Sequence, residues 1–487
     1  MIAVLGAGPA GLTAAYELTR HGQPCVVLEQ GSQVGGLSRT VEHNGYLFDI
    51  GGHRFYTAVP LIEKIWTETL DEDMLVRPRL SRIYYRQHFF QYPLEPMNVV
   101  RGLGPVEVFR CGLSYAFARF RKRGNEKHFE EWVSNRFGKR LFEIFFRTYT
   151  EKVWGIPCDE IGAEWAAQRI RGLSFGTLVK QTLLSGRKPV RSLIKEFLYP
   201  RRGPGMMWDR MRARVEKAGG RVLTDHPVEA IEMEDGRVAA VRAGGQRFEV
   251  NGVISTLALG DLLPMVEPPP PQPALRAAAG LRYRDFLTVA LMVRGRGLFP
   301  DNWIYIHEPG VKVGRIQNYT NWSPEMAPDP EMSCLGMEYF CFEGDGLWTS
   351  SDEQLGELAR REIASLGLVD PARIEGFAVV RVPKAYPMYD GAYRDHRQTL
   401  GSWFRGIPNL EAAGRNGLHR YDNQDHAMLS GIMAARNLIG GHFDLFEWQQ
   451  NDYLEDAESA LAAEWAKLEA TQPAVPKPIS GSGDAVR

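Results

Sequence analysis

A glycine-rich motif near the start of the chain constrains its fold more than any other sequence feature. Residues 6–11 read Gly-Ala-Gly-Pro-Ala-Gly and directly follow an apolar segment at residues 2–5. A helical pattern then runs to Arg20, and a second apolar segment at residues 25–29 ends on Glu29. This order of strand, glycine turn, helix, strand and acidic residue is typical of a βαβ unit that binds a dinucleotide.

Each residue of the motif has an expected task. Gly6 allows the tight turn, Gly8 leaves room for a pyrophosphate beside the backbone, and Gly11 lets the helix pack closely on the strand. Pro9 and Ala10 begin the helix, whose free N–H groups and partial positive charge favour bound phosphates.

The acidic residue at the end of the second strand indicates which nucleotide binds. Glu29 can accept hydrogen bonds from an adenosine ribose and disfavours a 2′-phosphate, and Gln30 follows it. A glycine-rich turn without a ligand is the alternative. Because all parts of the unit occur in order, we favour a Rossmann-like nucleotide site.

Composition narrows the class of partner. The 487 residues carry a formal net charge of −1, which gives no reason to expect nucleic acid as a partner. The five cysteines are scattered, without a CxxC pair or a nearby His cluster, so we expect reduced thiols and no metal site. No signal peptide and no apolar run of about 18 residues is recognisable. We therefore expect a cytoplasmic protein without stable membrane insertion, and the oligomeric state stays open.

The pattern along the chain predicts an α/β protein with a discontinuous nucleotide-binding domain, an inserted helical domain and a second, mixed or antiparallel β-sheet domain. The expected ranges are 1–90, 200–267 and 405–445 for the first domain, 91–199 for the helical insert, 268–404 for the sheet domain, 446–470 for a C-terminal helix and 471–487 for a disordered tail. The expected strands include 222–243, with an Asp235-Gly236 turn, then 253–256, 286–293, 303–307, 313–319, 335–342 and 410–413. Residues 99–198 are expected to be helical, 199–205 to form a loop, and 425–438 to form a helix.

A second glycine motif indicates the nature of the dinucleotide. Residues 35–40 read Gly-Gly-Leu-Ser-Arg-Thr and resemble the motif that follows the βαβ unit in flavoproteins of the glutathione-reductase, amine-oxidase and protoporphyrinogen-oxidase type. The resemblance implies FAD, with Ser38 and Arg39 near its pyrophosphate and the backbone of Val228 at the adenine. Gly414-Arg415 and the helix after it resemble the late segment near the isoalloxazine. A second GxGxxG is absent, so NAD(P)H would bind elsewhere or the reductant is a separate protein.

Several further segments share their order with one branch of these flavoproteins. Residues 51–53 read Gly-Gly-His, residues 149–155 read Tyr-Thr-Glu-Lys-Val-Trp-Gly, and residues 165–169 end on Arg169. Tyr305 precedes Arg315 by ten residues, residues 385–387 read Ala-Tyr-Pro, and residues 414–426 contain a GR…RY…NQDH pattern. These segments resemble UDP-galactopyranose mutases, and residues 91–93 resemble the loop on the uridine side.

The resemblance implies a pyranose–furanose mutase that acts on a nucleotide sugar such as UDP-galactose. Reduced FAD would act through a flavin N5–sugar covalent adduct, without net redox change. The implied catalytic residues are Arg169, Arg315, His53, Tyr305, Tyr386 and Tyr421, and the implied substrate-binding residues are Gln91, Trp154, Arg169, Tyr305, Arg315, Tyr386 and Tyr421. The expected cofactor-binding residues are Gly6, Gly8, Pro9, Ala10, Gly11, Glu29, Gln30, Gly36, Leu37, Ser38, Arg39, Gly51, Gly52, His53, Val228, Gly414, Arg415, Asn423, Gln424 and Asp425.

Elementary chemistry agrees with the implied substrate-binding residues. A nucleoside diphosphate leaving group needs cations that hold both phosphates, and arginine supplies bidentate donors that are always charged. Each assignment also has a structural alternative. These are an ion pair on a helix face for Arg169, a solvated strand face for Arg315 and Tyr305, a structural role for His53, core packing for Trp154, and Tyr389 in place of Tyr386.

Two other function classes stay open. The Gly-Gly-Leu-Ser-Arg segment fits an FAD-dependent oxidase or desaturase of the protoporphyrinogen-oxidase or amine-oxidase type equally well, which would need an apolar pocket. A non-enzymatic, flavin-stabilised binding module is the second alternative. The stretch at residues 109–123 is amphipathic and basic, and we expect it to be a solvated helix face rather than a membrane-binding surface.

Overall fold

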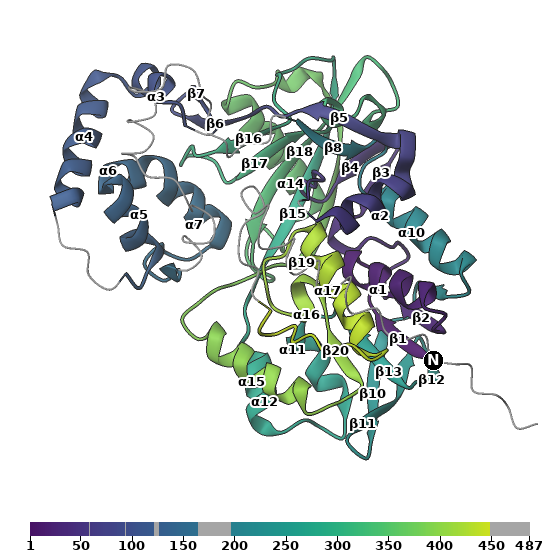
Figure 1. Cartoon of the computed structure of the whole chain (residues 1–487). Coiled ribbons are helices and arrows are strands. Elements are labelled where there is room, and N and C mark those ends of the chain that lie inside the picture. Colours follow the sequence, from purple (N-terminus) through teal and green to yellow (C-terminus); the bar gives the residue numbers. More distant parts are fainter. Residues whose placement is uncertain (58, 93, 121–125, 164–195, 449–487) are drawn as a thin grey trace, which may run out of the picture.

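The computed structural model describes residues 1–57, 59–92, 94–120, 126–163 and 196–448 (Figure 1). Arg169, most of the predicted helix 446–470 and the predicted tail lie outside these residues. The described chain is a mixed α/β protein with several sheets, as the sequence predicted.

A parallel sheet of five strands, in the order β20-β13-β1-β2-β9, carries the glycine motif. Its inner strands are continuous apolar runs because both faces of a parallel sheet are normally covered. The strands of this sheet are β1 (Ile2–Leu5), β2 (Cys25–Leu28), β9 (Arg221–Leu223), β13 (Gly252–Ser255) and β20 (Leu410–Ala412). The sequence predicted four of them as separate strands. The strand that it predicted from residue 222 to the Asp235-Gly236 turn is instead divided, because β9 ends at Leu223 and a strand of another sheet begins at Val228.

Two glycines allow close packing around helix α1 (Pro9–Arg20), one against the glycine turn and one from helix α17 (Gln424–Asn437). A Cβ atom on Gly11 would lie 1.9 Å from the carbonyl oxygen of Gly6. A Cβ atom on Gly431 would lie 2.2 Å from the carbonyl oxygen of Ala10. Helices α2 (Pro60–Leu70) and α10 (Gly205–Lys217) pack beside this pair.

The Gly431→Ala variant is expected to lose about 2–3 kcal/mol of unfolding free energy, because its methyl group meets backbone atoms that cannot rotate away. Gly112 in helix α4 (Pro105–Phe120) is a matched control, since nothing lies within 4 Å of an added Cβ atom. The unfolding free energy of Gly112→Ala should rise by up to about 1 kcal/mol, because alanine has a higher helix propensity than glycine. Urea unfolding of both variants checks the difference, and equal effects would contradict the packing argument.

A four-stranded sheet, in the order β12-β11-β10-β14, lies beside the parallel sheet. The predicted turn at Asp235-Gly236 joins two of its strands, and both residues have positive φ values of 48° and 75°. This is the backbone conformation that a two-residue hairpin turn requires. The strands are β10 (Val228–Glu234), β11 (Arg237–Ala243), β12 (Gln246–Glu249) and β14 (Val266–Glu267).

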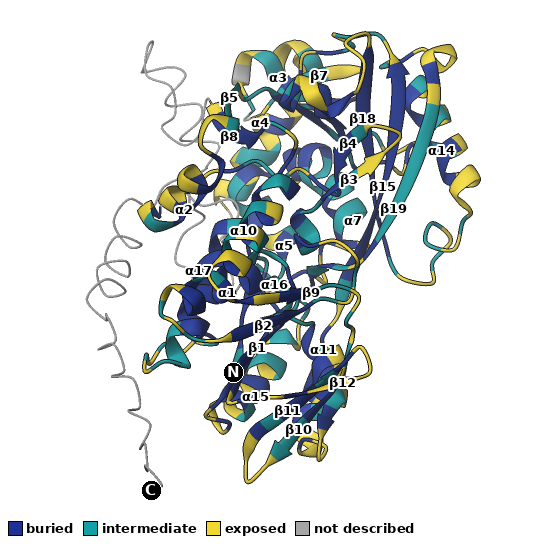
Figure 2. Ribbon diagram, turned by 90° about the vertical axis from the view of Figure 1, so that its right-hand side faces the viewer, coloured by how far each residue is buried: buried dark blue, intermediate teal, exposed yellow. Residues whose placement is uncertain are grey.

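A seven-stranded mixed sheet, in the order β19-β15-β18-β17-β16-β6-β7, forms the second large sheet. Its central strands β15 and β18 are buried along most of their length (Figure 2). Helix α14 (Asp352–Ser365), which begins with a Ser351–Gln354 capping box, packs on β15 and β19. The strands are β6 (Ser81–Tyr85), β7 (His88–Gln91), β15 (Tyr283–Arg294), β16 (Trp303–Ile306), β17 (Arg315–Asn318), β18 (Met332–Cys341) and β19 (Ile374–Pro387).

The sequence predicted four of these strands but not β6, β7 and β19. β6 and most of β7 fall in the range 1–90 assigned to the first domain, yet β6 pairs in parallel with β16. Conversely, helix α12 (Gln272–Gly280) and all but the last residue of helix α15 (Tyr393–Arg405) fall in the range 268–404, yet their apolar residues pack in the hydrophobic core of the parallel sheet. Local sequence patterns could not reveal to which sheet or core these elements belong, because the contacts join segments that are distant in sequence.

A helical lobe projects from the large sheet, on the left of Figure 1. Its core includes the buried residues Phe129, Phe142 and Trp154. The sequence predicted a helical pattern up to residue 198, but residues 196–200 form a strand. The loop predicted at 199–205 therefore begins only after Pro200. There, β8 (Glu196–Pro200) pairs with β5 (Met74–Pro78), because Phe197 and Tyr199 are buried against Trp322.

The remaining described elements are short or complete the lobe. The helices are α3 (Pro96–Leu103), α5 (Phe129–Phe137), α6 (Lys139–Phe142), a π-helical turn (Glu143–Arg147), α7 (Thr148–Trp154), α11 (Leu259–Leu262), α13 (Tyr319–Trp322) and α16 (Gly414–Gly417), and the strands are β3 (Thr40–His43) and β4 (Tyr46–Asp49). None of the helices in the described ranges is both long and apolar enough to cross a bilayer. The five cysteines are free and buried.

A buried carboxyl group joins strands β4 and β8. Asp49 is 1% exposed and accepts hydrogen bonds from Tyr199 Oη at 2.6 Å and Thr40 Oγ1 at 2.8 Å. Burial raises its pKa from 3.8 to about 7, and the two hydrogen bonds oppose this shift. The folded protein therefore binds the Asp49 proton more tightly than the unfolded chain does.

The stability that Asp49 contributes should be fully present below about pH 4 and be lost as the pH rises to about 7, because its folded pKa is the higher one. Asp49→Asn should remove this loss, which is on the order of 2–4 kcal/mol. Urea unfolding from pH 4.5 to 8 measures it as the difference between wild type and variant. A pH-independent difference between the two proteins would contradict the assignment.

Candidate functional site

A cavity of about 1210 Å³ extends from the glycine motif to the helical lobe. It exceeds the roughly 300–1,000 Å³ of common small-molecule pockets, so it has room for more than one ligand part. Among the predicted cofactor residues, all except Gly11 line it. Gly11 instead performs its predicted packing role against the backbone of Gly6.

The glycine turn forms an open cradle at one end of the cavity. Gly6 has a φ of +97°, and the heavy atom nearest to a Cβ atom on Gly8 would be Gly36 Cα at 3.7 Å. Glu29 accepts hydrogen bonds from Ala7 N at 2.8 Å and from Gly31 N at 2.9 Å. The carboxylate predicted to bind a ribose therefore also holds the turn in place.

The second glycine motif packs against the first one. Gly36 has a φ of +52°, and a Cβ atom there would lie 3.0 Å from Gly8 Cα. The Arg39 guanidinium donates to the carbonyl oxygen of Gly36 at 3.0 Å and lines the cavity. Burial lowers the pKa of Arg39, while the charge of Glu29 opposes the shift. A cation thus lies next to the cradle, where a pyrophosphate would bind.

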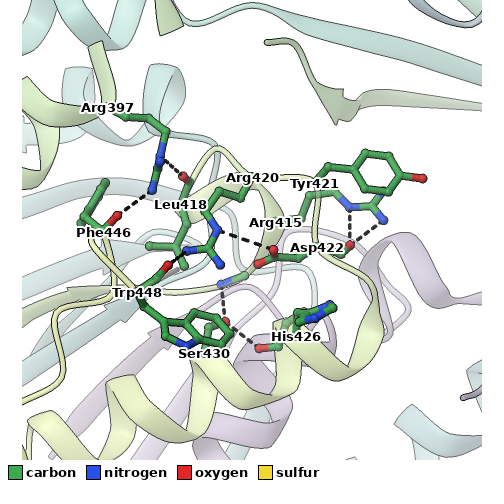
Figure 3. A network of polar contacts seen from close by, with 12 residues as sticks. Arg397, Arg415, Leu418, Arg420, Tyr421, Asp422, His426, Ser430, Phe446 and Trp448 are labelled. Atoms are coloured by element: carbon green, nitrogen blue, oxygen red, sulfur yellow. Dashed lines mark hydrogen bonds and ion pairs between the residues drawn. The ribbon is translucent and has the colours of Figure 1, made fainter. Parts of the chain in front are cut away.

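Arg415 also lines the cavity and is held there by backbone carbonyl groups. Its Nε and Nη2 atoms donate to the carbonyl oxygen of Asp422 at 2.9 and 2.7 Å (Figure 3). Its Nη1 atom donates to the carbonyl oxygen of Ala385 at 2.9 Å. The guanidinium carbon lies 4.8 Å from the centre of the Tyr421 ring and 5.5 Å from that of Tyr386. Because its partners are neutral, this cation remains available to an anionic ligand.

Buried polar atoms test whether a flavin dinucleotide fits. His53 Nδ1, Asn416 Oδ1 and Gln424 Oε1 are buried without a hydrogen-bond partner among the described residues, and all three residues line this cavity. Buried polar groups normally have a partner, so these atoms indicate a polar ligand. Together with the cradle and the cationic Arg39, they fit FAD.

His53 is neutral in this environment. Burial, together with the smaller effects of the Arg415 and Arg315 charges, lowers its pKa from 6.5 to about 3. The ring lies close to Gly51, since a Cβ atom there would be 3.0 Å from His53 Cε1. His53 is therefore a hydrogen-bonding group beside the cavity and not a cation.

Arg315 is the central cation of the other half of the cavity. It forms an ion pair with Glu338, which lies directly opposite on β18. Its Nη2 atom donates to Tyr386 Oη at 3.2 Å. Its side chain is 18% exposed and that of Glu338 is fully buried. The solvated-face alternative is therefore wrong for Arg315.

Aromatic rings surround Arg315. Tyr386 and Tyr421 stack with centroids 5.5 Å apart and an interplanar angle of 13°. Tyr305 lines the cavity between the rings of Tyr92 and Tyr149, at 5.1 and 5.5 Å. The structure therefore brings together the three predicted tyrosines Tyr305, Tyr386 and Tyr421.

Tyr386 and Tyr389, the two alternatives for one predicted role, differ in their contacts, and Tyr386 is the one that lines the cavity. Tyr389 does not line the cavity, and its Oη atom accepts a hydrogen bond from the backbone N of Tyr421 at 2.6 Å. Tyr389 thus supports the loop that carries Tyr421. Trp154 is 3% exposed, lines the cavity and belongs to the core of the helical lobe, as predicted for a pocket-shaping residue.

One predicted substrate residue does not reach the cavity. Gln91 is absent from its lining, and its neighbour Tyr92 lies there instead. Phe90 is buried in the lobe, and successive residues of a strand point to opposite faces, so Gln91 points away from that core. Arg169 lies outside the described residues.

Sequence reasoning did not assign roles to Glu338 and Tyr149. Glu338 accepts a hydrogen bond from Gln317 Nε2 at 2.9 Å and neutralises Arg315, but only the strand register reveals this. Tyr149 stacks on His307 at 4.9 Å, and burial raises its pKa well above the ordinary value. Its presence in the segment 149–155 was a signal that could have found it.

Comparisons with known proteins agree with a flavin site. The family described as flavin containing amine oxidoreductase matches residues 9–439. "Inactive all-trans-retinol 13,14-reductase" of Danio rerio is 24% identical over 52% of this chain and 46% of its own length. A Klebsiella pneumoniae protein named "Probable UDP-galactopyranose mutase" is 25% identical over 33% of this chain and 43% of its own length. The chain thus spans less than half the length of these two curated relatives.

Solved structures show the same fold. A reduced UDP-galactopyranose mutase superposes with a TM-score of 0.78 at 21% identity, covering 90% of this chain and 95% of that one. A redesigned putrescine oxidase superposes with a TM-score of 0.62 at 17% identity, covering 90% and 98%. The family match spans most of the chain, and family membership implies FAD. The chain belongs to the flavin containing amine oxidoreductase family.

Proposed function

We propose that this flavoprotein is a pyranose–furanose mutase that acts on a nucleotide sugar of the UDP-galactose type. The observation that carries the proposal is the cluster of Arg315, Tyr305, Tyr386 and Tyr421, which line the same cavity as the predicted flavin-binding residues. A guanidinium group and three phenol groups in one cavity suit a diphosphate. An apolar substrate would not need them.

Reduced FAD, when bound, would supply an electron-rich nitrogen that can attack the anomeric carbon of the sugar. The protein's own part is to hold the diphosphate as its bond to that carbon breaks and to return it after the ring has changed size. Arg315 and, by the resemblance, Arg169 would stabilise the negative charge that develops on the leaving diphosphate. The hydroxyl groups of Tyr305, Tyr386 and Tyr421 donate hydrogen bonds to it. Substrate and product have the same composition, so no electrons are lost or gained overall.

Glu338 is a positioning residue in this proposal. Its ion pair with Arg315 and its hydrogen bond from Gln317 hold the guanidinium in one orientation. Preorganised donors of this kind require little reorganisation when charge develops. His53, which burial keeps neutral, would hydrogen-bond to the flavin without adding charge. NAD(P)H or a separate protein would supply the reducing electrons.

The direct test measures ring-size interconversion. Dithionite-reduced protein is incubated with UDP-, dTDP- and GDP-galactose in each ring form, and the two forms are separated by anion-exchange chromatography. We expect interconversion with one nucleotide, only in the reduced state, and without oxygen uptake. Failure with every donor would contradict the proposed substrate class.

One observation favours an oxidase or desaturase as the second candidate. Phe129, Phe145, Phe146 and Leu94 line the part of the cavity next to the helical lobe, and they would suit an apolar substrate. In that case, oxidised protein should consume oxygen or reduce a dye with an organic substrate, and nucleotide sugars should have no effect. The same preparation can be assayed for both activities.

A further inference from the structure

Helix α7 joins the helical lobe to the large sheet through a lysine. Figure 1 shows α7 on the side of the lobe that faces the sheet. Lys152 Nζ donates to the backbone carbonyl oxygens of Ile306 at 3.3 Å, Glu308 at 2.5 Å and Val313 at 3.3 Å. Ile306 and Glu308 lie on one arm of the connection between β16 and β17, and Val313 lies on the other arm. The ammonium group therefore bridges the two arms of this loop.

The bridge lies next to two residues that line the cavity. Tyr305 and Arg315 are directly paired in the register of β16 and β17. The loop that joins the two strands spans residues 307–314, which is longer than the roughly two to five residues of common hairpin loops. Such a loop does not fix the strand register by its own turn geometry, and a slip of one residue would turn each side chain to the other face of the sheet. Contacts from outside the loop must therefore hold the pair in place.

A carboxylate holds the same loop as well. Glu362 of helix α14 is 7% exposed and accepts hydrogen bonds from Lys312 N at 2.6 Å and from Val313 N at 3.0 Å. The amide of Val313 is thus bound to an anion and its carbonyl oxygen to a cation. Because Val313 is buried, the loss of either charged group would leave a backbone polar group without a partner.

Helix α7 is itself anchored to the sheet beside Lys152. Arg284 of β15 is 5% exposed, and it donates to the carbonyl oxygens of Val153 at 3.1 Å and of Lys152 at 3.4 Å. These carbonyl groups are in the last turn of α7, where they have no partner within the helix. Tyr149 and Trp154 of the same helix line the cavity. The lysine therefore extends from a fixed helix that also forms a wall of the cavity.

We propose that Lys152 is a positioning residue for the diphosphate site, which closes the loop between β16 and β17 and thereby holds Tyr305 and Arg315 in register against the helical lobe. The proposal rests on the function proposed above, because it takes a nucleoside diphosphate as the ligand of Arg315. Lys152 does not line the cavity, so it acts through these two residues. Such support matters because a misplacement of about 1 Å can cost roughly 100-fold in rate.

The charge of Lys152 gives this role a pH dependence. Burial lowers the pKa of Lys152 to about 8, while the charges of Glu362 and Glu308 oppose the shift. The ring of His307 and the guanidinium of Arg284 are the other titratable or charged groups that face it. A neutral amine has only two N–H donors, so it cannot bind three carbonyl oxygens. The loop should therefore loosen as the pH rises through about 8.

The test measures nucleotide binding by the full-length, FAD-loaded protein with UDP, dTDP and GDP in turn, using isothermal titration calorimetry. Lys152→Met removes the donors and keeps an unbranched side chain of similar length. The dissociation constant of the nucleotide that binds the wild type should rise about tenfold or more in this variant. FAD content should stay at the wild-type level, because the glycine cradle belongs to other elements. Lys139→Met, which replaces an exposed lysine of the same lobe, should change neither value.

The pH profile separates positioning from a general loss of structure. In the wild type, the dissociation constant of the nucleotide should rise between about pH 7 and 9, and this rise should be absent from Lys152→Met. A flat wild-type profile would overturn the proposal whether or not the variant folds. Wild-type affinity in Lys152→Met would overturn it too.

A wild type that binds none of the three nucleotides would contradict the proposed function, and hydrogen exchange then tests the lysine by itself. Ile306 N donates to Gly314 O, and Gly314 N donates to Glu338 O, both at 2.9 Å. These two amides should exchange about tenfold faster in Lys152→Met than in Lys139→Met, because the loop opens more often. Equal exchange rates in the two variants would show that Lys152 does not hold the loop.

Discussion

The Arg315→Met variant is expected to lose about 3–5 kcal/mol of unfolding free energy, because it leaves the fully buried Glu338 as an unpaired charge. Burying a charge without its partner is among the largest effects of a single substitution. If Arg315 also stabilises a leaving diphosphate, kcat/KM should fall by about 10²–10³-fold. Urea unfolding measures the first effect, and initial rates of ring interconversion measure the second.

The double variant Arg315→Met/Glu338→Gln separates the two roles of Arg315. Glutamine removes the stranded charge and keeps an oxygen that can accept the hydrogen bond from Gln317, so most of the lost stability should return. Turnover should not return, because the cation that faces the substrate is still missing. Recovery of both stability and kcat/KM would show that Arg315 serves only to neutralise Glu338.

The Gly11→Ala variant is expected to lose most of its bound flavin, with a dissociation constant raised by about 100-fold or more. The new Cβ atom would lie 1.9 Å from the carbonyl oxygen of Gly6, so the glycine turn and helix α1 must separate. Gly8 and Gly36 form the cradle next to the contact between Gly11 and Gly6. A shift of the glycine turn therefore changes the flavin site, although Gly11 itself does not line the cavity.

A matched substitution shows whether the loss of flavin is specific. Gly310 is exposed and has nothing within 4 Å of an added Cβ atom, so Gly310→Ala should retain full flavin content. Fluorescence titration of deflavinated protein with FAD gives both dissociation constants. Wild-type affinity in Gly11→Ala would contradict the close packing of α1 on the turn.

Local sequence patterns predicted the cofactor half of the site well. The glycine motif, Glu29 and the second motif at residues 35–40 are contiguous segments whose backbone conformation depends on their own residues. The structure places these predicted residues in one cavity, apart from Gly11. The late segment Gly414-Arg415 joins them through strand β20, as the resemblance implied.

The substrate half could be predicted only in part. Tyr305, Arg315, Tyr386 and Tyr421 were found through a resemblance, and the structure brings them together. Gln91, which the resemblance implied to bind substrate, is absent from the cavity lining, because its orientation depends on which face of β7 meets the helical lobe. Local sequence carries little information about that choice.

The amino-acid sequence by itself determined the FAD-binding unit, since the φ values and close contacts that the unit needs can be met only by glycine at Gly6 and Gly11. Tertiary structure alone decided that Glu338 neutralises Arg315, that Tyr389 supports the loop of Tyr421, and that α4 turns its apolar side outward. Strand register and helix orientation are set by burial of the whole molecule. A side chain's partner across a sheet therefore cannot be read from its neighbours in sequence.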